Sequence, residues 1–165
     1  MSSGGEVRIR PATAEDVEQI YAFIVELAEY EHAAEQVTGT PELLATALFG
    51  GAAPPAAEAL IAEVDGDTAG FALFHGTFST WECRPGIWLE DLYVPARGRR
   101  AGVGRALLER LAQLTLERGC TRLEWNALDW NDPALAFYEQ LGATRLSEWE
   151  LHRLDGEALK RVAGA

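Results

Sequence analysis

The most informative segment of this sequence is residues 97–104, which read Arg97-Gly98-Arg99-Arg100-Ala101-Gly102-Val103-Gly104. The segment joins a predicted strand to a predicted helix. A helix N-terminus presents unpaired backbone N–H groups and the positive end of the helix dipole. Glycines let that backbone approach an anion closely, and the arginines add positive charge. The segment therefore predicts a turn that binds a phosphate or a diphosphate.

Two well-known phosphate-binding loops are excluded by the residues themselves. A Walker-type loop needs Lys and then Ser or Thr after its last glycine, but Arg105-Ala106 follows Gly104. A dinucleotide-binding fingerprint needs a third small residue where Leu107 stands. The alternative interpretation is that Gly102 and Gly104 only begin a tightly packed helix. The run of arginines favours anion binding over that alternative.

Hydrophobic periodicity predicts the elements on either side of the turn. Thr13 and Asp16 stand in a capping-box pattern at the start of the first helix. The predicted order is a strand at 7–10, helices at 13–30 and 41–48, strands at 60–64, 68–78 and 87–94, a helix at 102–119, a strand at 122–127, a helix at 133–141 and a last strand from Thr144 onward. This order suits one α/β domain with a mixed sheet and helices on both faces.

Length and composition predict a single soluble domain. The chain has 165 residues, of which 48% are hydrophobic and 24% are charged. We expect one domain over residues 1–165, with residues 1–5 disordered. The start, Met1-Ser2-Ser3-Gly4-Gly5, lacks the basic and apolar parts of a signal peptide, and no apolar stretch is long enough for a membrane span. With two widely separated cysteines, Cys83 and Cys120, a cytoplasmic location is expected.

The net charge of -12 argues against a nucleic-acid-binding surface. An acidic surface could attract a cationic substrate such as a polyamine. The alternative is that the charge only aids solubility, and composition by itself favours this alternative.

The motif Arg99-x-x-Gly102-x-Gly104 resembles the acetyl-CoA signature of the GNAT acetyltransferase superfamily. Leu89-Glu90-Asp91-Leu92-Tyr93-Val94 occupies the place of that superfamily's fourth strand, and Trp130-Asn131 through Tyr138 to Gly142-Ala143 resembles its second cofactor motif. The similarity runs from Ile9 to the end of the predicted sheet. It implies a mixed, mostly antiparallel sheet with a splayed fourth strand.

Within the superfamily the sequence is most similar to diamine acetyltransferases, the spermidine/spermine and thialysine group. The segments that carry this likeness are Glu26-Leu27-Ala28-Glu29-Tyr30-Glu31, Glu35-Gln36-Val37, Leu89-Glu90-Asp91, and Glu124-Trp125 leading to Trp130-Asn131. The group acts on small amines and forms homodimers, so both are expected here by resemblance.

The resemblance implies which residues bind acetyl-CoA. The backbone of the fourth strand would pair with the pantetheine arm, the glycine turn would hold the diphosphate, and the later helix would contact the arm. These residues are Leu92, Tyr93, Val94, Arg99, Arg100, Ala101, Gly102, Val103, Gly104, Arg105, Asn131, Ala134 and Tyr138. For Asn131, capping of the helix that Pro133 opens is an equal alternative.

Acetyl transfer to an amine needs a base for the ammonium, whose pKa is ~10.4, and an acid for the departing thiolate. Glu90 is the candidate base, directly or through a water, and Tyr138 is the candidate acid. In the resembled enzymes, residues at these two places are assigned such roles. The alternatives are an ordinary charge at a strand end for Glu90 and a core aromatic for Tyr138.

The acceptor side is predicted from acidic and aromatic residues. By resemblance Glu26, Trp81, Glu90 and Asp91 would contact the amine, whereas Glu29 and Glu31 are interpreted as a solvated helix face. His75 is interpreted as an ordinary strand residue, since no partner is visible in the sequence. The three histidines and two cysteines show no metal-ligand spacing, so no metal is expected.

The sequence therefore predicts an acetyl-CoA-dependent N-acetyltransferase acting on a small primary amine. Two alternatives stay open. One is an acyl-CoA-binding sensor without turnover, against which the presence of both Glu90 and Tyr138 argues. The other is an acetyltransferase whose acceptor is a protein amine.

Overall fold

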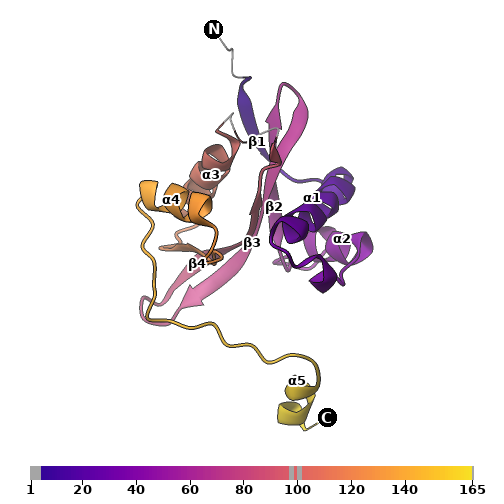
Figure 1. The fold of residues 1–165 in the computed structure, drawn as a ribbon, viewed down its shortest axis with the longest axis vertical. Coiled ribbons are helices and arrows are strands. Elements are labelled where there is room, and N and C mark those ends of the chain that lie inside the picture. Colours follow the sequence, from indigo (N-terminus) through magenta and orange to yellow (C-terminus); the bar gives the residue numbers. More distant parts are fainter. Residues whose placement is uncertain (1–4, 97–98, 100–101, 165) are drawn as a thin grey trace. The chain divides into compact units, whose positions relative to one another are not determined.

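A computed structural model describes residues 5–96, 99 and 102–164 of the chain. Residues 1–4, which with Gly5 were expected to be disordered, lie outside the described residues. The chain divides into two compact units, Met1–Asn126 and Ala127–Ala165. The first unit holds the sheet, and the second holds two helices and the segment that joins them (Figure 1).

The first unit is a five-stranded sheet with three α-helices. Its elements are β1 Val7–Pro11, the short 3₁₀ helix η1 Ala14–Asp16, α1 Val17–Tyr30, the 3₁₀ helix η2 Ala34–Gln36, α2 Pro41–Phe49, β2 Glu58–Val64, β3 Asp67–Ser79, β4 Arg84–Tyr93, α3 Val103–Glu117 and β5 Leu123–Trp125. The strands lie in chain order. The pairs β1–β2, β2–β3 and β3–β4 are antiparallel, and the pair β4–β5 is parallel. The predicted mixed, mostly antiparallel sheet is confirmed.

Helices cover both faces of this sheet, as predicted (Figure 1). On one face, Phe23 of α1 and Leu48 of α2 pack in a core cluster with Phe71 of β3 and Tyr93 of β4. The rings of Phe23 and Phe71 are stacked, with their centroids 5.9 Å apart. On the other face, α3 buries a stripe of apolar side chains at helical spacing, Val103, Leu107 and Leu111.

An ion-pair network fixes the entry into α1. Thr13 N donates to Asp16 Oδ2 at 2.7 Å, which is one half of the predicted capping box. The guanidinium of Arg10 on β1 donates to both oxygens of Asp16, at 2.7 and 2.8 Å, and to Glu63 of β2 at 2.7 Å. This contact holds the pKa of Asp16 at about 2, below its ordinary value. The carboxylate therefore ties the first helix to the first two strands at any pH above that range.

The second unit contains α4 Asp132–Gln140 and α5 Gly156–Ala163. The prediction of a last strand from Thr144 onward is wrong, because residues 144–155 contain no strand. The backbone bond described within this segment runs from Trp149 N to Leu146 O and closes a turn. Alternation of apolar and polar residues describes the faces of a strand, but a strand also needs a ladder partner, which the alternation does not specify.

Candidate active site

The strand β4 carries one residue more than the part of β3 that it faces. Leu73 pairs with Asp91 and Phe74 pairs with Leu89, so Glu90 is the extra residue. Such a β-bulge interrupts the alternation of side chains between the two faces of a sheet. Asp91 and Trp88 therefore point to the same face although they are three residues apart. It is the face covered by α1 and α2, because Leu73 belongs to the core beneath these helices.

The bulge also marks the place where β4 and β5 part. Their parallel pairing joins Ile87 to Leu123, Trp88 to Glu124 and Leu89 to Trp125. The described ladder ends there, one residue before the bulge, while β4 continues to Tyr93. The splayed fourth strand is confirmed. Beyond Leu89, the backbone edge of β4 that faces away from β3 can pair with an extended ligand arm.

Four carboxylates from α1 and β4 lie on the α1 side of the sheet. Tyr93 of β4 donates its hydroxyl to Glu26 of α1 at 2.9 Å, which fixes that carboxylate beside the strand. Asp91 is half-buried. Its burial, with added repulsion from Glu90 and Glu31, raises its pKa from the ordinary value of 3.8 to about 6. Burial also raises the pKa of Glu31. A cation bound here would relieve this accumulated negative charge.

Glu90 is held by neighbours on both strands of the hairpin. The indole Nε1 of Trp88 donates to Glu90 Oε2 at 3.0 Å. Nε2 of His75, on β3, lies 3.8 Å from the same oxygen. The Glu90 side chain is 56% exposed, so it remains accessible to a substrate. Since an amine must lose a proton before it attacks, a carboxylate held in this way can act as a base.

The glycine turn has the backbone geometry that anion binding needs. Gly102 precedes α3 with φ of 74°, a left-handed conformation that glycine adopts without strain. The first turn of α3, which is described throughout, carries no acidic residue. Arg105 follows in that turn and lies 3.9 Å from Glu109. The α3 N-terminus can therefore hold a diphosphate. Arg100 and Ala101, also predicted to bind the cofactor, lie outside the described residues.

Arg99 links this turn to the end of α1. Its Nε donates to the carbonyl oxygen of Val94 at 3.2 Å. Its guanidinium carbon lies 5.2 Å from the centroid of the Tyr30 ring, within the range of a cation–π contact. The segment around the glycine turn and the end of α1 are thus joined through the side chain of Arg99.

The second unit carries the remaining predicted residues on α4. Asn131 stands at the N-cap, and its carbonyl oxygen accepts a hydrogen bond from Leu135 N at 3.0 Å. Ala134 and Tyr138 are one helical turn apart and lie on the same side of α4. Both are half-buried, and the Tyr138 ring lies 5.5 Å from that of Phe137. These three residues belong to the second unit, whereas Glu90 belongs to the first.

Comparison with known proteins identifies the family. Residues 19–143 match the model of the Acetyltransferase (GNAT) family. The chain belongs to this family. It is an acyltransferase, and its relatives are named N-acetyltransferases. Thialysine N-epsilon-acetyltransferase of Bos taurus is 37% identical, with 96% of this chain and 98% of that protein covered.

Other relatives show the same family and fold. The human spermidine/spermine N(1)-acetyltransferase-like protein 1 is 32% identical over 94% of this chain, which corresponds to 24% of that protein. An integron cassette protein from the mobile metagenome of V. cholerae has a TM-score of 0.77, with 24% identity, over 96% of this chain and 98% of that one. That likeness shows the fold of this acetyltransferase to be the GNAT fold.

The structure does not bring Trp81 to the other predicted acceptor-side residues. Trp81 lies in the turn between β3 and β4, with 85% of its surface exposed. From Arg84, where β4 begins, to Glu90 the strand rises by about 20 Å, at roughly 3.3 Å per residue. Trp81 is therefore at the far end of the hairpin.

Sequence reasoning missed two contributions to the site of this acetyltransferase. Glu31 was interpreted as part of a solvated face, but it is half-buried and acts on Asp91. His75 was interpreted as an isolated strand residue, but it lies beside Glu90. The pairing of His75 with Trp88 belongs to the hairpin register that runs from Ser79 and Arg84 up to the bulge. The resemblance to GNAT enzymes implies a bulge in the fourth strand, but no residue of the sequence marks its position.

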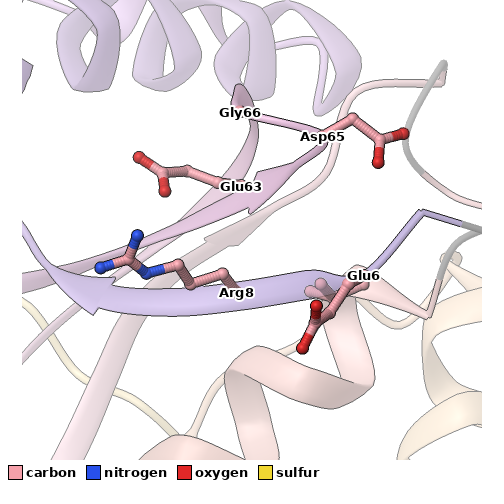
Figure 2. A pocket seen from close by; sticks show the side chains of 6 residues that line it. Glu6, Arg8, Glu63, Asp65 and Gly66 are labelled. Atoms are coloured by element: carbon pink, nitrogen blue, oxygen red, sulfur yellow. The ribbon is translucent and has the colours of Figure 1, made fainter.

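A separate hollow lies at another edge of the sheet. It has a volume of about 430 Å³ and is lined by Glu6, Val7, Arg8, Glu63, Asp65 and Gly66. Figure 2 shows Arg8 and Glu63 on neighbouring strands, with Asp65 and Gly66 at the adjoining turn. Since Glu63 is already paired with Arg10 and no predicted site residue lines the hollow, we assign it no part in acetyl transfer.

The described residues form neither a metal-ligand cluster nor a membrane-spanning helix. Within the described ranges, no three His, Cys, Asp or Glu side chains are grouped so that they could hold a metal ion. Of the helices formed by those residues, none has both the length and the apolar character that crossing a membrane requires.

The raised pKa of Asp91 predicts a pH-dependent cost in stability. Because the folded protein binds this proton more tightly than the unfolded chain, stability falls as pH rises from about 4 to about 6. Asp91→Asn should therefore be more stable than the wild type at pH 7.5, by about 3 kcal/mol at 1.36 kcal/mol per pKa unit, and nearly equal at pH 4. Urea unfolding at both pH values measures the difference. Asp67→Asn, at an exposed carboxylate, is the control and should change stability little. A variant less stable than the wild type at pH 7.5 would contradict the assignment.

Proposed function

We propose that this enzyme transfers the acetyl group of acetyl-CoA to a primary amine of a small diamine, polyamine or thialysine-like acceptor, by direct attack. The observation that carries the proposal is the gathering of Glu26, Glu31, Glu90 and Asp91 beside the splayed edge of β4. A cationic amine suits such a surface. The placement also puts the acceptor next to the strand edge at which the donor would pair.

The donor side of the proposal uses the glycine turn and the strand edge. Leu92, Tyr93 and Val94 would pair through their backbone with the pantetheine arm. Arg99 to Arg105 would surround the diphosphate, and Asn131, Ala134 and Tyr138 would contact the arm. When bound, acetyl-CoA supplies the activated thioester. The left-handed Gly102 and the end of the described β4–β5 ladder at Leu89 fit these two parts of the molecule.

The proton transfers are assigned to two side chains. Glu90 takes the proton of the acceptor ammonium, directly or through a water, and so makes the amine a nucleophile. Tyr138, whose phenol is protonated at neutral pH, donates its proton to the departing thiolate. The exposure of Glu90 and the held position of its Oε2 support the first assignment.

The acceptor would be recognised by charge. Asp91 and Glu26 flank the β4 backbone on the α1 side, and Glu31 adds a third carboxylate from the end of α1. Binding of an ammonium would lower the pKa of Asp91 toward its ordinary range, because an opposite charge favours the ionised form. Trp81, at the far end of the hairpin, takes no part in this acceptor site. The names of relatives that act on thialysine and on spermidine or spermine support this class of acceptor.

Further parts of the proposal rest on the sequence and its resemblance. We propose a single catalytic domain over residues 1–165, a homodimer, a cytoplasmic location, and no metal or nucleic acid. The net charge of -12 supports the last point. A non-catalytic acyl-CoA sensor and an acetyltransferase for protein amines are the alternatives.

Incubation with acetyl-CoA and a panel of amines distinguishes these functions. The panel contains thialysine, spermidine, ornithine, putrescine and a lysine-containing peptide, and release of free thiol is followed. We expect thiol release with at least one of the small diamines and much less with the peptide. Tight acetyl-CoA binding without turnover of any amine would support the sensor instead. Activity with the peptide alone would overturn the small-amine assignment.

Replacing Tyr138 tests its role as the acid. Tyr138→Phe should lower kcat at least about tenfold, because the thiolate then leaves without a proton donor. Binding of acetyl-CoA, measured by calorimetry, should stay within about twofold. Tyr21→Phe is the matched control, since its hydroxyl donates to Gly39 O at 2.9 Å in α1's surroundings and takes no part in the proposed chemistry. An unchanged kcat in Tyr138→Phe would remove Tyr138 from the mechanism.

A further inference from the structure

His75 and Glu90 lie together on the acceptor side of the sheet. His75 of β3 pairs in register with Trp88 of β4, and Glu90 follows Trp88 by two residues, so it lies on the same face of the sheet. Trp88 Nε1 donates to Glu90 Oε2 at 3.0 Å, and His75 Nε2 lies 3.8 Å from that oxygen. Both contacts fall on Oε2, which is therefore the oxygen that faces His75.

The other ring nitrogen of His75 decides which tautomer faces Glu90. Nδ1 lies 3.1 Å from the carbonyl oxygen of Gly76. A carbonyl oxygen can only accept a hydrogen bond, so the proton of the neutral ring is on Nδ1. Nε2 then presents its lone pair to Glu90. A lone pair and an ionised carboxylate share no hydrogen, which is consistent with a separation of 3.8 Å rather than a hydrogen bond.

This arrangement has room for one shared proton. A proton gained by Glu90 can form a hydrogen bond from its oxygen to Nε2. If the proton moves to Nε2, the imidazolium and the carboxylate form an ion pair instead. The His75 side chain is 39% exposed, so it can pass the proton on to water. The steps balance: the ammonium loses one proton to Glu90, Glu90 passes it to His75, and His75 releases it to solvent.

We propose that His75 is a positioning residue for Glu90 that also carries the acceptor's proton from Glu90 to solvent. The inference rests on the proposed function, in which Glu90 is the base. His75 thus joins Glu90 as a second group on the acceptor side. By removing the proton, it lets Glu90 return to its ionised form between turnovers, although the half-buried Asp91 lies next to it.

Other charged groups surround the pair. On β4, Asp91 is adjacent to Glu90. Glu31, at the end of α1, interacts electrostatically with Asp91. On β5, Glu124 pairs in register with Trp88 and lies 3.6 Å from Arg122. On β2, Glu58 pairs in register with Phe74, the neighbour of His75. Its Oε2 lies 2.6 Å from Nη1 of Arg118, the residue that follows α3. The acids of β4 and α1 would stabilise a protonated His75, whereas those of β2 and β5 are neutralised by arginines.

The experiment compares His75→Ala, His75→Gln and Glu90→Gln in the full-length protein, with thiol release as the assay. His75→Ala should lower kcat about fivefold to tenfold at pH 7 and leave the KM for acetyl-CoA within about twofold. Added imidazole should restore at least half of the lost kcat, because a free base can take over the proton. His75→Gln, which can hold Glu90 but cannot carry a proton, should be as slow as His75→Ala. His152→Gln is the matched control, since His152 lies 4.0 Å from Glu150 in the other unit.

The pH profile provides a second readout that a purely structural role would not move. In the wild type the pair loses activity when it takes up its first proton. Without His75 that proton must reside on Glu90 itself, so the acidic limb of kcat/KM should move to lower pH by about one unit. His75→Gln provides this readout even if His75→Ala fails to fold.

The outcomes separate this inference from the proposed function. If Glu90→Gln is inactive while His75→Ala and His75→Gln keep wild-type kcat and pH profile, His75 has no role and Glu90 stays the base. If the His75 variants are slow but imidazole restores nothing and the profile is unmoved, the inference is also overturned, since the effect is then structural. If Glu90→Gln keeps full activity, the proposed function of Glu90 fails first.

Discussion

One extra residue in β4 determines the layout of the site. If β4 matched β3 residue for residue, Asp91 and Trp88 would point to opposite faces of the sheet. No irregularity in β4 would then mark the place where its described pairing with β5 ends. With Glu90 inserted, both side chains point toward α1, and the pairing with β5 ends at Leu89. The bulge thus coincides with two features: the end of the described pairing with β5 and, on the adjoining face, a group of acids.

The packing beneath α1 keeps this geometry in place. Phe23 lies against Phe71 and Tyr93, with ring centroids 5.9 and 5.6 Å apart. The hydroxyl of Tyr93 donates a hydrogen bond to Glu26. The core residue that anchors the strand therefore also orients an acid at the surface of the site. At the end of the same helix, Tyr30 meets Arg99. The helix α1 is therefore tied both to β4 and to Arg99 beside the glycine turn.

The sequence predicts the elements of the first unit well and the cooperation between them poorly. Apolar spacing in α1 and α3 specifies local structure, and the structure confirms both helices. The strand from Thr144 failed because its pattern names no ladder partner. The contact between His75 and Glu90 was missed because it depends on which residues the hairpin places opposite one another, and the place of Asp91 on the same face depends on a one-residue shift in register. The desolvation of Glu31 likewise follows from tertiary packing, which a helical pattern of charges does not report.

The central claim is that the part of β4 beyond the bulge is the donor's pairing edge. Amide hydrogen exchange with and without saturating acetyl-CoA tests it most directly, with β1, the opposite edge of the sheet, as the internal reference. The account predicts exchange at least about tenfold slower at those amides of residues 92–94 that face away from β3 and at the start of α3, and no change in β1, because new backbone hydrogen bonds protect only the amides that make them. Saturated binding of acetyl-CoA with unchanged exchange at residues 92–94 would contradict it.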